Sequence, residues 1–102
     1  MAQVSHLTGA VSCGQVTAAL TQCVPYLTGA VKTPQAACCA GIQTVKGQLG
    51  TTADRRQACD CIKTAAAGIK NLNDQAITAL PGACNSPLPF AITRNMNCQS
   101  IP

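Results

Sequence analysis

The fold of this chain is decided by residues 38–61, which read CCAGIQTVKGQLGTTADRRQACDC. The stretch opens on two adjacent cysteines and closes on two cysteines separated by one aspartate. Between them, apolar residues recur at three- and four-residue steps until a Gly-Thr-Thr break. That pattern is typical of one amphipathic helix that ends and a second that begins. We therefore expect two consecutive helices, each carrying a pair of cysteines.

The composition of the chain indicates a core that is poor in volume. Hydrophobic residues make up 47% of its 102 residues, but 17 of them are alanines and 8 are cysteines. Tyr26 and Phe90 are the only aromatic residues, so the large rings that dominate most cores are nearly absent. We expect four disulfides, each worth about 2 to 4 kcal/mol, to supply the missing stability. Such cysteine usage is typical of secreted domains.

Apolar periodicity predicts a first helix within residues 12–29 and a second within residues 34–50. Ser12 is a suitable cap for the first helix, and Pro25 is expected to bend it. Pro34 is expected in the first turn of the second helix, where its missing N–H costs nothing. Both helices are amphipathic, so each should bury one face.

A third helix is predicted within residues 51–71, with Thr51 as cap residue, an aspartate in its first turn, and Gly68 and Asn71 marking its end. Asn73 can cap a fourth helix, which we expect Pro81 and the glycine after it to stop. Residues 84–102 show no period and are rich in proline and polar residues. The chain is thus predicted to be all-α, with four helices and an irregular C-terminal coil.

The residue inventory argues against an enzyme. His6 is the only histidine, so no Ser-His or Cys-His pair can be built around a structured base. Three aspartates and no glutamate leave little for a carboxylate pair, and Asp54 and Asp60 would not share a helix face. No glycine-rich phosphate loop is present. We therefore expect no catalytic residue and no cofactor.

Charge and cysteine spacing exclude two further classes. The seven Lys and Arg residues, which give a net charge of +4, are dispersed without interleaved aromatics, so no nucleic-acid surface is expected. A weak attraction to anionic lipid surfaces is the functional interpretation of that charge that remains.

A zinc site is also disfavoured, because paired ligands usually have two to four residues between them and often include histidine. We therefore expect no metal.

The spacing of the cysteines carries the most specific signal. Spacing alone allows about 105 pairings of eight cysteines and does not choose among them. The successive gaps are nine, fourteen, zero, nineteen, one, twenty-two and thirteen residues. Together with residues 13–16, 38–42 and 80–82, this order closely resembles the eight-cysteine motif of plant non-specific lipid-transfer proteins of type 1, in the prolamin superfamily. The resemblance covers residues 11–102.

The resemblance implies a bundle of four helices, stapled by disulfides, around a lengthwise hydrophobic tunnel that the C-terminal coil covers. It also implies four disulfide pairs. They are Cys13–Cys61, Cys23–Cys38, Cys39–Cys84 and Cys59–Cys98.

Two short family signatures have counterparts in this chain. Residues 51–55 match the first, Thr/Ser-x-x-Asp-Arg/Lys, which implies that Arg55 lies at a tunnel mouth and binds a lipid head group. Residues 89–93 match the second, Pro-Tyr-x-Ile-Ser, except that Phe90 replaces the tyrosine and removes its hydroxyl. Ala83 replaces the family's lysine after Pro-Gly, which leaves Arg55 as the main predicted anchor.

The helical stripes and the tail supply candidate lining residues for the tunnel, and the resemblance implies that they bind lipid. Small wall residues held apart by bridges favour a cavity that the chain itself does not fill, and acyl chains gain about 0.8 kcal/mol per buried CH₂. The predicted lining residues are Leu20, Ile42, Val45, Leu49, Ile62, Ala66, Ile69, Ile77, Leu88, Phe90 and Ile92.

We therefore expect a secreted monomer of the cell wall or apoplast that carries fatty acids, lysophospholipids or phospholipids and touches membranes transiently. Residues 1–10 are expected to be a flexible extension or a cloning remnant, and residues 11–102 the lipid-transfer domain. A membrane-disrupting antimicrobial defence protein is the first alternative, motivated by the +4 charge. An inhibitor of digestive enzymes is the second, because related eight-cysteine scaffolds have that activity.

Overall fold

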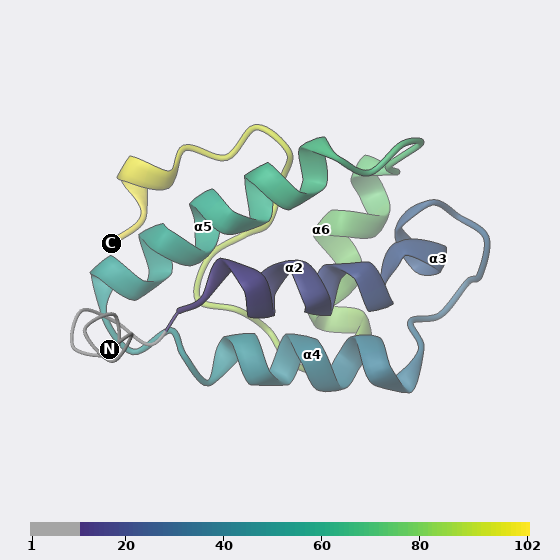
Figure 1. Ribbon diagram of the computed structural model, residues 1–102, viewed down its shortest axis with the longest axis horizontal. Helices are drawn as coiled ribbons and strands as arrows, with labels where there is room; N and C mark the ends of the chain where they lie inside the picture. The colour runs from purple at the N-terminus through teal and green to yellow at the C-terminus, as the bar shows by residue number, and fades with distance from the viewer. Residues whose placement is uncertain (1–10) are drawn as a thin grey trace.

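The computed structural model describes residues 11–102. The predictions for residues 1–10, including His6, lie outside this part of the chain. The all-α prediction is confirmed: within residues 11–102 there are helices and no strand (Figure 1). None of these helices is both long and apolar enough to cross a bilayer. The elements are α2 (Cys13–Gln22), α3 (Val24–Leu27), α4 (Ala36–Lys46), α5 (Thr52–Ala67), α6 (Asp74–Ala83) and the 3₁₀ helix η1 (Cys98–Ser100).

Side-chain caps begin three of the helices where the sequence predicts them. The Ser12 hydroxyl accepts from the backbone N–H of Gln15 at the start of α2. The Thr51 hydroxyl accepts from the N–H of Asp54 at 3.0 Å and caps α5. The Asn73 carboxamide oxygen accepts from the N–H groups of the second and third residues of α6 at 2.9 and 3.2 Å. These bonds satisfy donors that a helix start otherwise leaves unpaired.

Three prolines are placed differently from the prediction. The first helix breaks at Cys23 rather than at Pro25, which lies in the first turn of α3 and needs no N–H donor there. Pro34 precedes the cap residue of α4, Gln35, and so lies outside the helix. Pro81 does not stop α6, which continues to Ala83. It is close enough to the helix end that few hydrogen bonds are affected, and its ring is buried in the protein.

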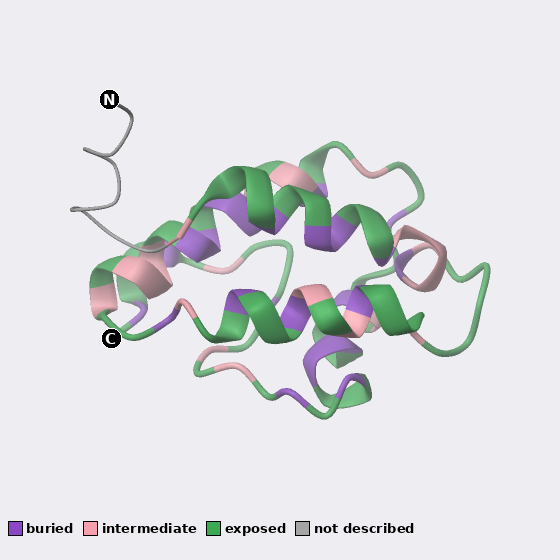
Figure 2. Ribbon diagram, turned by 60° about the horizontal axis from the view of Figure 1, so that its bottom comes forward, coloured by how far each residue is buried: buried purple, intermediate pink, exposed green. Residues whose placement is uncertain are grey.

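The helices pack around one apolar centre. α2 lies between α4 and α5, while α3 packs against α6 (Figure 1). Figure 2 shows the buried residues on the sides of the helices that face one another. α2 and α4 approach closely at Gly41, where an added Cβ would lie 2.7 Å from the Cβ of Ala19. The tail returns along α5, and η1 packs on that helix.

Four disulfides connect these elements, and their pairs are the ones that the resemblance implies. No cysteine is free, so none offers a thiolate to a metal. Cys13–Cys61 joins α2 to α5, Cys23–Cys38 joins the α2–α3 junction to α4, Cys39–Cys84 joins α4 to the end of α6, and Cys59–Cys98 joins α5 to η1.

Candidate functional site

The centre of the bundle contains an apolar cavity of about 10 Å³. Three helices and the tail contribute its wall, and every lining side chain is aliphatic. A cavity of this size holds about one water molecule at most. The lining residues are Val16, Ala19 and Leu20 of α2, Ile42 and Val45 of α4, Ile62 of α5, and Leu88 and Ile92 of the tail.

The side chains predicted to line the tunnel converge between the helices and form one apolar interior. Leu88 and Ile92 contribute to this, because they close the fourth side of the cavity that the three helices leave open. These residues therefore form an apolar interior, and the cavity lies among them.

The structure brings six of the predicted lining residues to the cavity wall, and places the others around it. Ala66 and Ile77 are buried in the same core, while Ile69 and Phe90 are half-buried and pack against it. Leu49 is buried but stands apart from this cluster. The six residues at the wall are Leu20, Ile42, Val45, Ile62, Leu88 and Ile92.

Two wall residues, Val16 and Ala19, were not among the predicted lining residues. Val16 begins the apolar stripe of the first helix, so its spacing from Leu20 could have identified it. Ala19 carries no such signal, because its place at the wall depends on the close approach of α4 at Gly41.

Arg55 lies at the start of α5 and holds two backbone segments together. Its Nη1 donates to the carbonyl of Leu49 at 3.1 Å, and its Nε donates to the carbonyl of Pro102 at 2.9 Å. Its Nη2 donates to the Thr52 hydroxyl at 3.3 Å. A guanidinium has five N–H donors, so two remain without a partner among residues 11–102. Arg55 does not line the central cavity.

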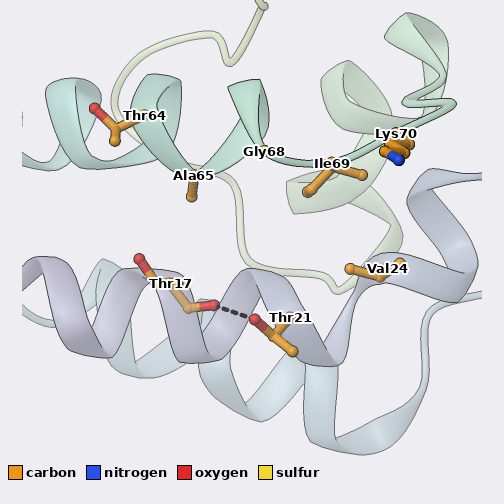
Figure 3. A pocket seen from close by; sticks show the side chains of 8 residues that line it. All are labelled: Thr17, Thr21, Val24, Thr64, Ala65, Gly68, Ile69 and Lys70. Atoms are coloured by element: carbon orange, nitrogen blue, oxygen red, sulfur yellow. Dashed lines mark hydrogen bonds between the residues drawn. The ribbon is translucent and has the colours of Figure 1, made fainter.

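A surface hollow of about 610 Å³ lies between α2 and the C-terminal part of α5 (Figure 3). Of the predicted lining residues, it contains only Ile69. Threonines face it from both helices, and the Thr21 hydroxyl donates to the carbonyl of Thr17 at 2.8 Å. It shares no residue with the central cavity. We call this the α2–α5 hollow; its lining is Thr17, Thr21, Val24, Thr64, Ala65, Gly68, Ile69 and Lys70.

A second surface hollow, of about 380 Å³, lies between α6 and the tail. Leu88 and Ile92 line both this hollow and the central cavity. The Thr78 hydroxyl, from α6, donates to the carbonyl of Ile92 at 3.1 Å. We call this the α6–tail hollow; its lining is Thr78, Pro81, Gly82, Pro87, Leu88, Pro89, Phe90, Ala91 and Ile92.

Comparison with known proteins places this arrangement in a family. Residues 13–98 match the protease inhibitor/seed storage/LTP family. Non-specific lipid-transfer protein 3 of Lens culinaris is 50% identical over 90% of this chain and 77% of its own length. Non-specific lipid-transfer protein A of Ricinus communis is 46% identical over 89% of this chain and 99% of its own.

Solved structures show the same fold. Barley non-specific lipid transfer protein 1, in complex with a lysophosphatidylcholine, is 33% identical, with a TM-score of 0.82 over 90% of this chain and 100% of its own. The hazelnut allergen Cor a 8 is 35% identical, with a TM-score of 0.84 over 91% of this chain and 100% of its own. The wheat protein complexed with two phospholipid molecules is 34% identical, with a TM-score of 0.78 over 86% of this chain and 97% of its own. The bridged helices, the apolar interior and these likenesses together show that the chain belongs to the non-specific lipid-transfer proteins.

Proposed function

We propose that this protein binds fatty acids, lysophospholipids or phospholipids by their acyl chains and carries them through water. The observation that carries the proposal is the wholly aliphatic wall of the central cavity, to which three helices and the tail contribute. Each buried CH₂ of a ligand gains about 0.8 kcal/mol, and this gain is not directional. Binding should therefore depend on chain length more than on the chemical details of the chain.

Complexes of relatives support the ligand class. The barley relative is solved with a lysophosphatidylcholine, and the wheat relative with two phospholipids and, separately, with prostaglandin B2. These ligands share a long apolar chain and a polar head. The same combination suits an apolar interior that opens to a surface.

The proposal includes no covalent step. All eight cysteines are in disulfides, so no thiolate nucleophile is available. Residues 11–102 contain no histidine, and none of the three aspartates lines the central cavity. We further propose that residues 11–102 form the whole lipid-carrying domain, and that it acts as a secreted monomer that touches membranes transiently.

A displacement titration tests the proposed function directly. A fluorescent fatty acid is bound to the oxidised protein and displaced by lysophosphatidylcholines of increasing chain length. We expect saturable binding that tightens with chain length, and loss of binding after the disulfides are reduced. An absence of saturable binding by the oxidised protein would refute the proposal.

Dye leakage separates the carrier from the membrane-disrupting alternative. The carrier should leave anionic vesicles intact at low salt, where attraction to the +4 protein is strongest. Salt-sensitive leakage would favour the defence protein instead.

The proposal assigns the head group to Arg55, whose two remaining N–H groups can donate to a carboxylate or phosphate. Arg55→Ala should lower the affinity for a fatty acid about tenfold more than the affinity for a neutral monoacylglycerol of equal chain length. This difference corresponds to about 1.4 kcal/mol. Arg56→Ala is the matched control, because Arg56 also donates to a tail carbonyl, that of Ile101. Equal losses for the charged and neutral ligands would show that Arg55 is not the anchor.

A further inference from the structure

One end of the molecule is formed by two connections that lie close together. Residues 28–35 join α3 to α4, and residues 68–73 join α5 to α6 (Figure 1). The backbone N–H of Asn73 donates to the carbonyl of Leu27 at 2.8 Å, which ties the second connection to the end of α3. We call this region the α3 end; it consists of α3 together with residues 28–35 and 68–73.

The first of these connections projects from the protein but is held in place. The N–H groups of Ala30 and Val31 both donate to the carbonyl of Pro25, at 2.8 and 3.1 Å. The disulfide Cys23–Cys38 closes the segment at its base. Residues 29–33 are nevertheless all exposed. A partner that binds this segment therefore loses little affinity to the ordering of its backbone.

Aliphatic side chains are accessible at the α3 end. Val31, 37% exposed, is the one large hydrophobic residue among residues 11–102 that is exposed. Its N–H contacts the carbonyl of Pro25, the neighbour of Val24. Val24 and Ile69 are half-buried and line the α2–α5 hollow together (Figure 3). The α3 end therefore presents several aliphatic side chains from α3 and both connections, and not a single isolated residue.

The charge that surrounds these side chains is positive. Lys32 and Lys70 are exposed, and neither forms an ion pair within residues 11–102. Asp74, the first residue of α6, pairs with Arg94 at 2.8 Å, so its charge is compensated locally. The other two aspartates lie earlier in α5. An apolar surface with two lysines matches an anionic lipid surface, where each lysine contributes about 1 kcal/mol.

We propose that the α3 end is the surface by which this protein docks on anionic membranes, with Val31 entering the interface and Lys32 and Lys70 lying against the lipid phosphates. The inference rests on the proposed function, because a carrier must meet a membrane to take up or release its lipid. A few aliphatic side chains and two lysines bind a bilayer weakly. Docking is therefore reversible, as a carrier that moves between membranes requires.

Three substitutions that remove the same charge test which part of the surface meets the membrane. Lys32→Gln and Lys70→Gln act at the α3 end, whereas Lys46→Gln acts in the last turn of α4. That helix begins beside the α3 end and leads away from it (Figure 1). Its 11 residues span about 16 Å, which exceeds the Debye length of about 10 Å at 0.1 M salt.

Partition of the oxidised protein is measured by cosedimentation at about 0.1 M salt. The vesicles contain phosphatidylcholine and phosphatidylserine in a ratio of about two to one. We expect Lys32→Gln and Lys70→Gln to weaken partition about fivefold each, which corresponds to about 1 kcal/mol. Lys46→Gln is the matched control and should weaken it by less than about twofold, because its charge is screened at that distance.

The entry of Val31 into the lipid is tested by a tryptophan in its place. The chain contains no tryptophan, so Val31→Trp supplies a single indole signal at a position suited to the membrane interface. On addition of the same vesicles, the emission should shift to shorter wavelength, and lipids brominated on their acyl chains should quench it. Gln43→Trp, at an exposed position of α4, is the control and should keep the emission of an indole in water.

A fatty-acid titration of the same samples separates docking from lipid binding. Equal losses of partition in the three lysine variants, or a Val31→Trp emission that vesicles leave unchanged, would overturn the docking surface. Saturable fatty-acid binding in those samples would leave the carrier function standing. An absence of saturable binding by the wild-type protein would overturn the carrier function and, with it, the role assigned to the α3 end.

Discussion

The helices and the tail of this protein are held by different kinds of interaction. Three of the helices, α2, α5 and α6, begin at side-chain caps, and three disulfides join the helices. The tail has one disulfide and is also held by side-chain hydrogen bonds: Arg56 and Lys63 donate to the carbonyls of Ile101 and Met96, and Arg94 of the tail donates to Asp74 and to the Leu72 carbonyl. Water can replace such partly exposed bonds at little cost. The molecule therefore combines a rigid wall with an adaptable one around a single apolar interior.

The largest effects should come from removing one disulfide from each region. Loss of Cys39–Cys84 or of Cys59–Cys98, each replaced by alanines, should lower the free energy of unfolding by about 2 to 4 kcal/mol. The two costs should be similar, because the bridges span 45 and 39 residues. Denaturant unfolding measures both.

The two variants should differ in local motion. Loss of Cys59–Cys98 should lower the NMR backbone order parameters of residues 90–97 far more than loss of Cys39–Cys84, because it frees the end of that segment next to Cys98. Equal order parameters in the two variants would contradict the division into a rigid and an adaptable wall.

Two glycine-to-alanine substitutions, one between two helices and one beside the tail, test whether the two regions are packed differently. Gly41→Ala places a Cβ 2.7 Å from that of Ala19 and should destabilise the protein by about 1 to 3 kcal/mol. Gly82→Ala meets open space beside the tail and should stabilise α6 by about 0.4 to 1 kcal/mol. Thermal unfolding checks both, and a Gly41→Ala protein as stable as wild type would show that α2 and α4 can separate.

The smallest effects on stability should come from replacing the two asparagines that cap α6 and η1. The Asn73 side chain accepts two backbone N–H bonds at the start of α6, and Asn97 accepts one at the start of η1. Asn73→Ala should lower the free energy of unfolding by about 1 kcal/mol, as is usual for the loss of an N-cap. Asn97→Ala should cost less, because η1 has only three residues to stabilise. Chemical denaturation measures the difference, and a larger cost at Asn97 would reverse the ranking of the two regions.

The helices could be predicted from the sequence because their signals are local. Ser12, Thr51 and Asn73 cap the helices that they were expected to cap, since an N-cap depends only on residues within one turn. Local signals failed at Pro81, which is buried and lies two residues before the end of α6. The disulfide pairs required the family resemblance, because cysteine spacing alone does not distinguish among pairings.

The site could be predicted only in part. Periodicity identified most of the aliphatic wall, including Ile42, Val45 and Ile62. It could not show how far the wall closes, because cavity volume depends on how side chains from distant segments pack. The partners of Arg55, six and 47 residues away, and the bond from Thr78 to Ile92 also depend on tertiary structure.

The central claim is that the acyl chain occupies the interior between the helices and the tail. The most direct measurement is the set of intermolecular nuclear Overhauser effects between the methylenes of lysophosphatidylcholine and the methyl groups of the isotope-labelled protein. We predict contacts to Val45, Ile62 and Leu88, which surround the central cavity. Contacts confined to Val24 and Ile69, in the α2–α5 hollow, would place the lipid on the surface and contradict the claim.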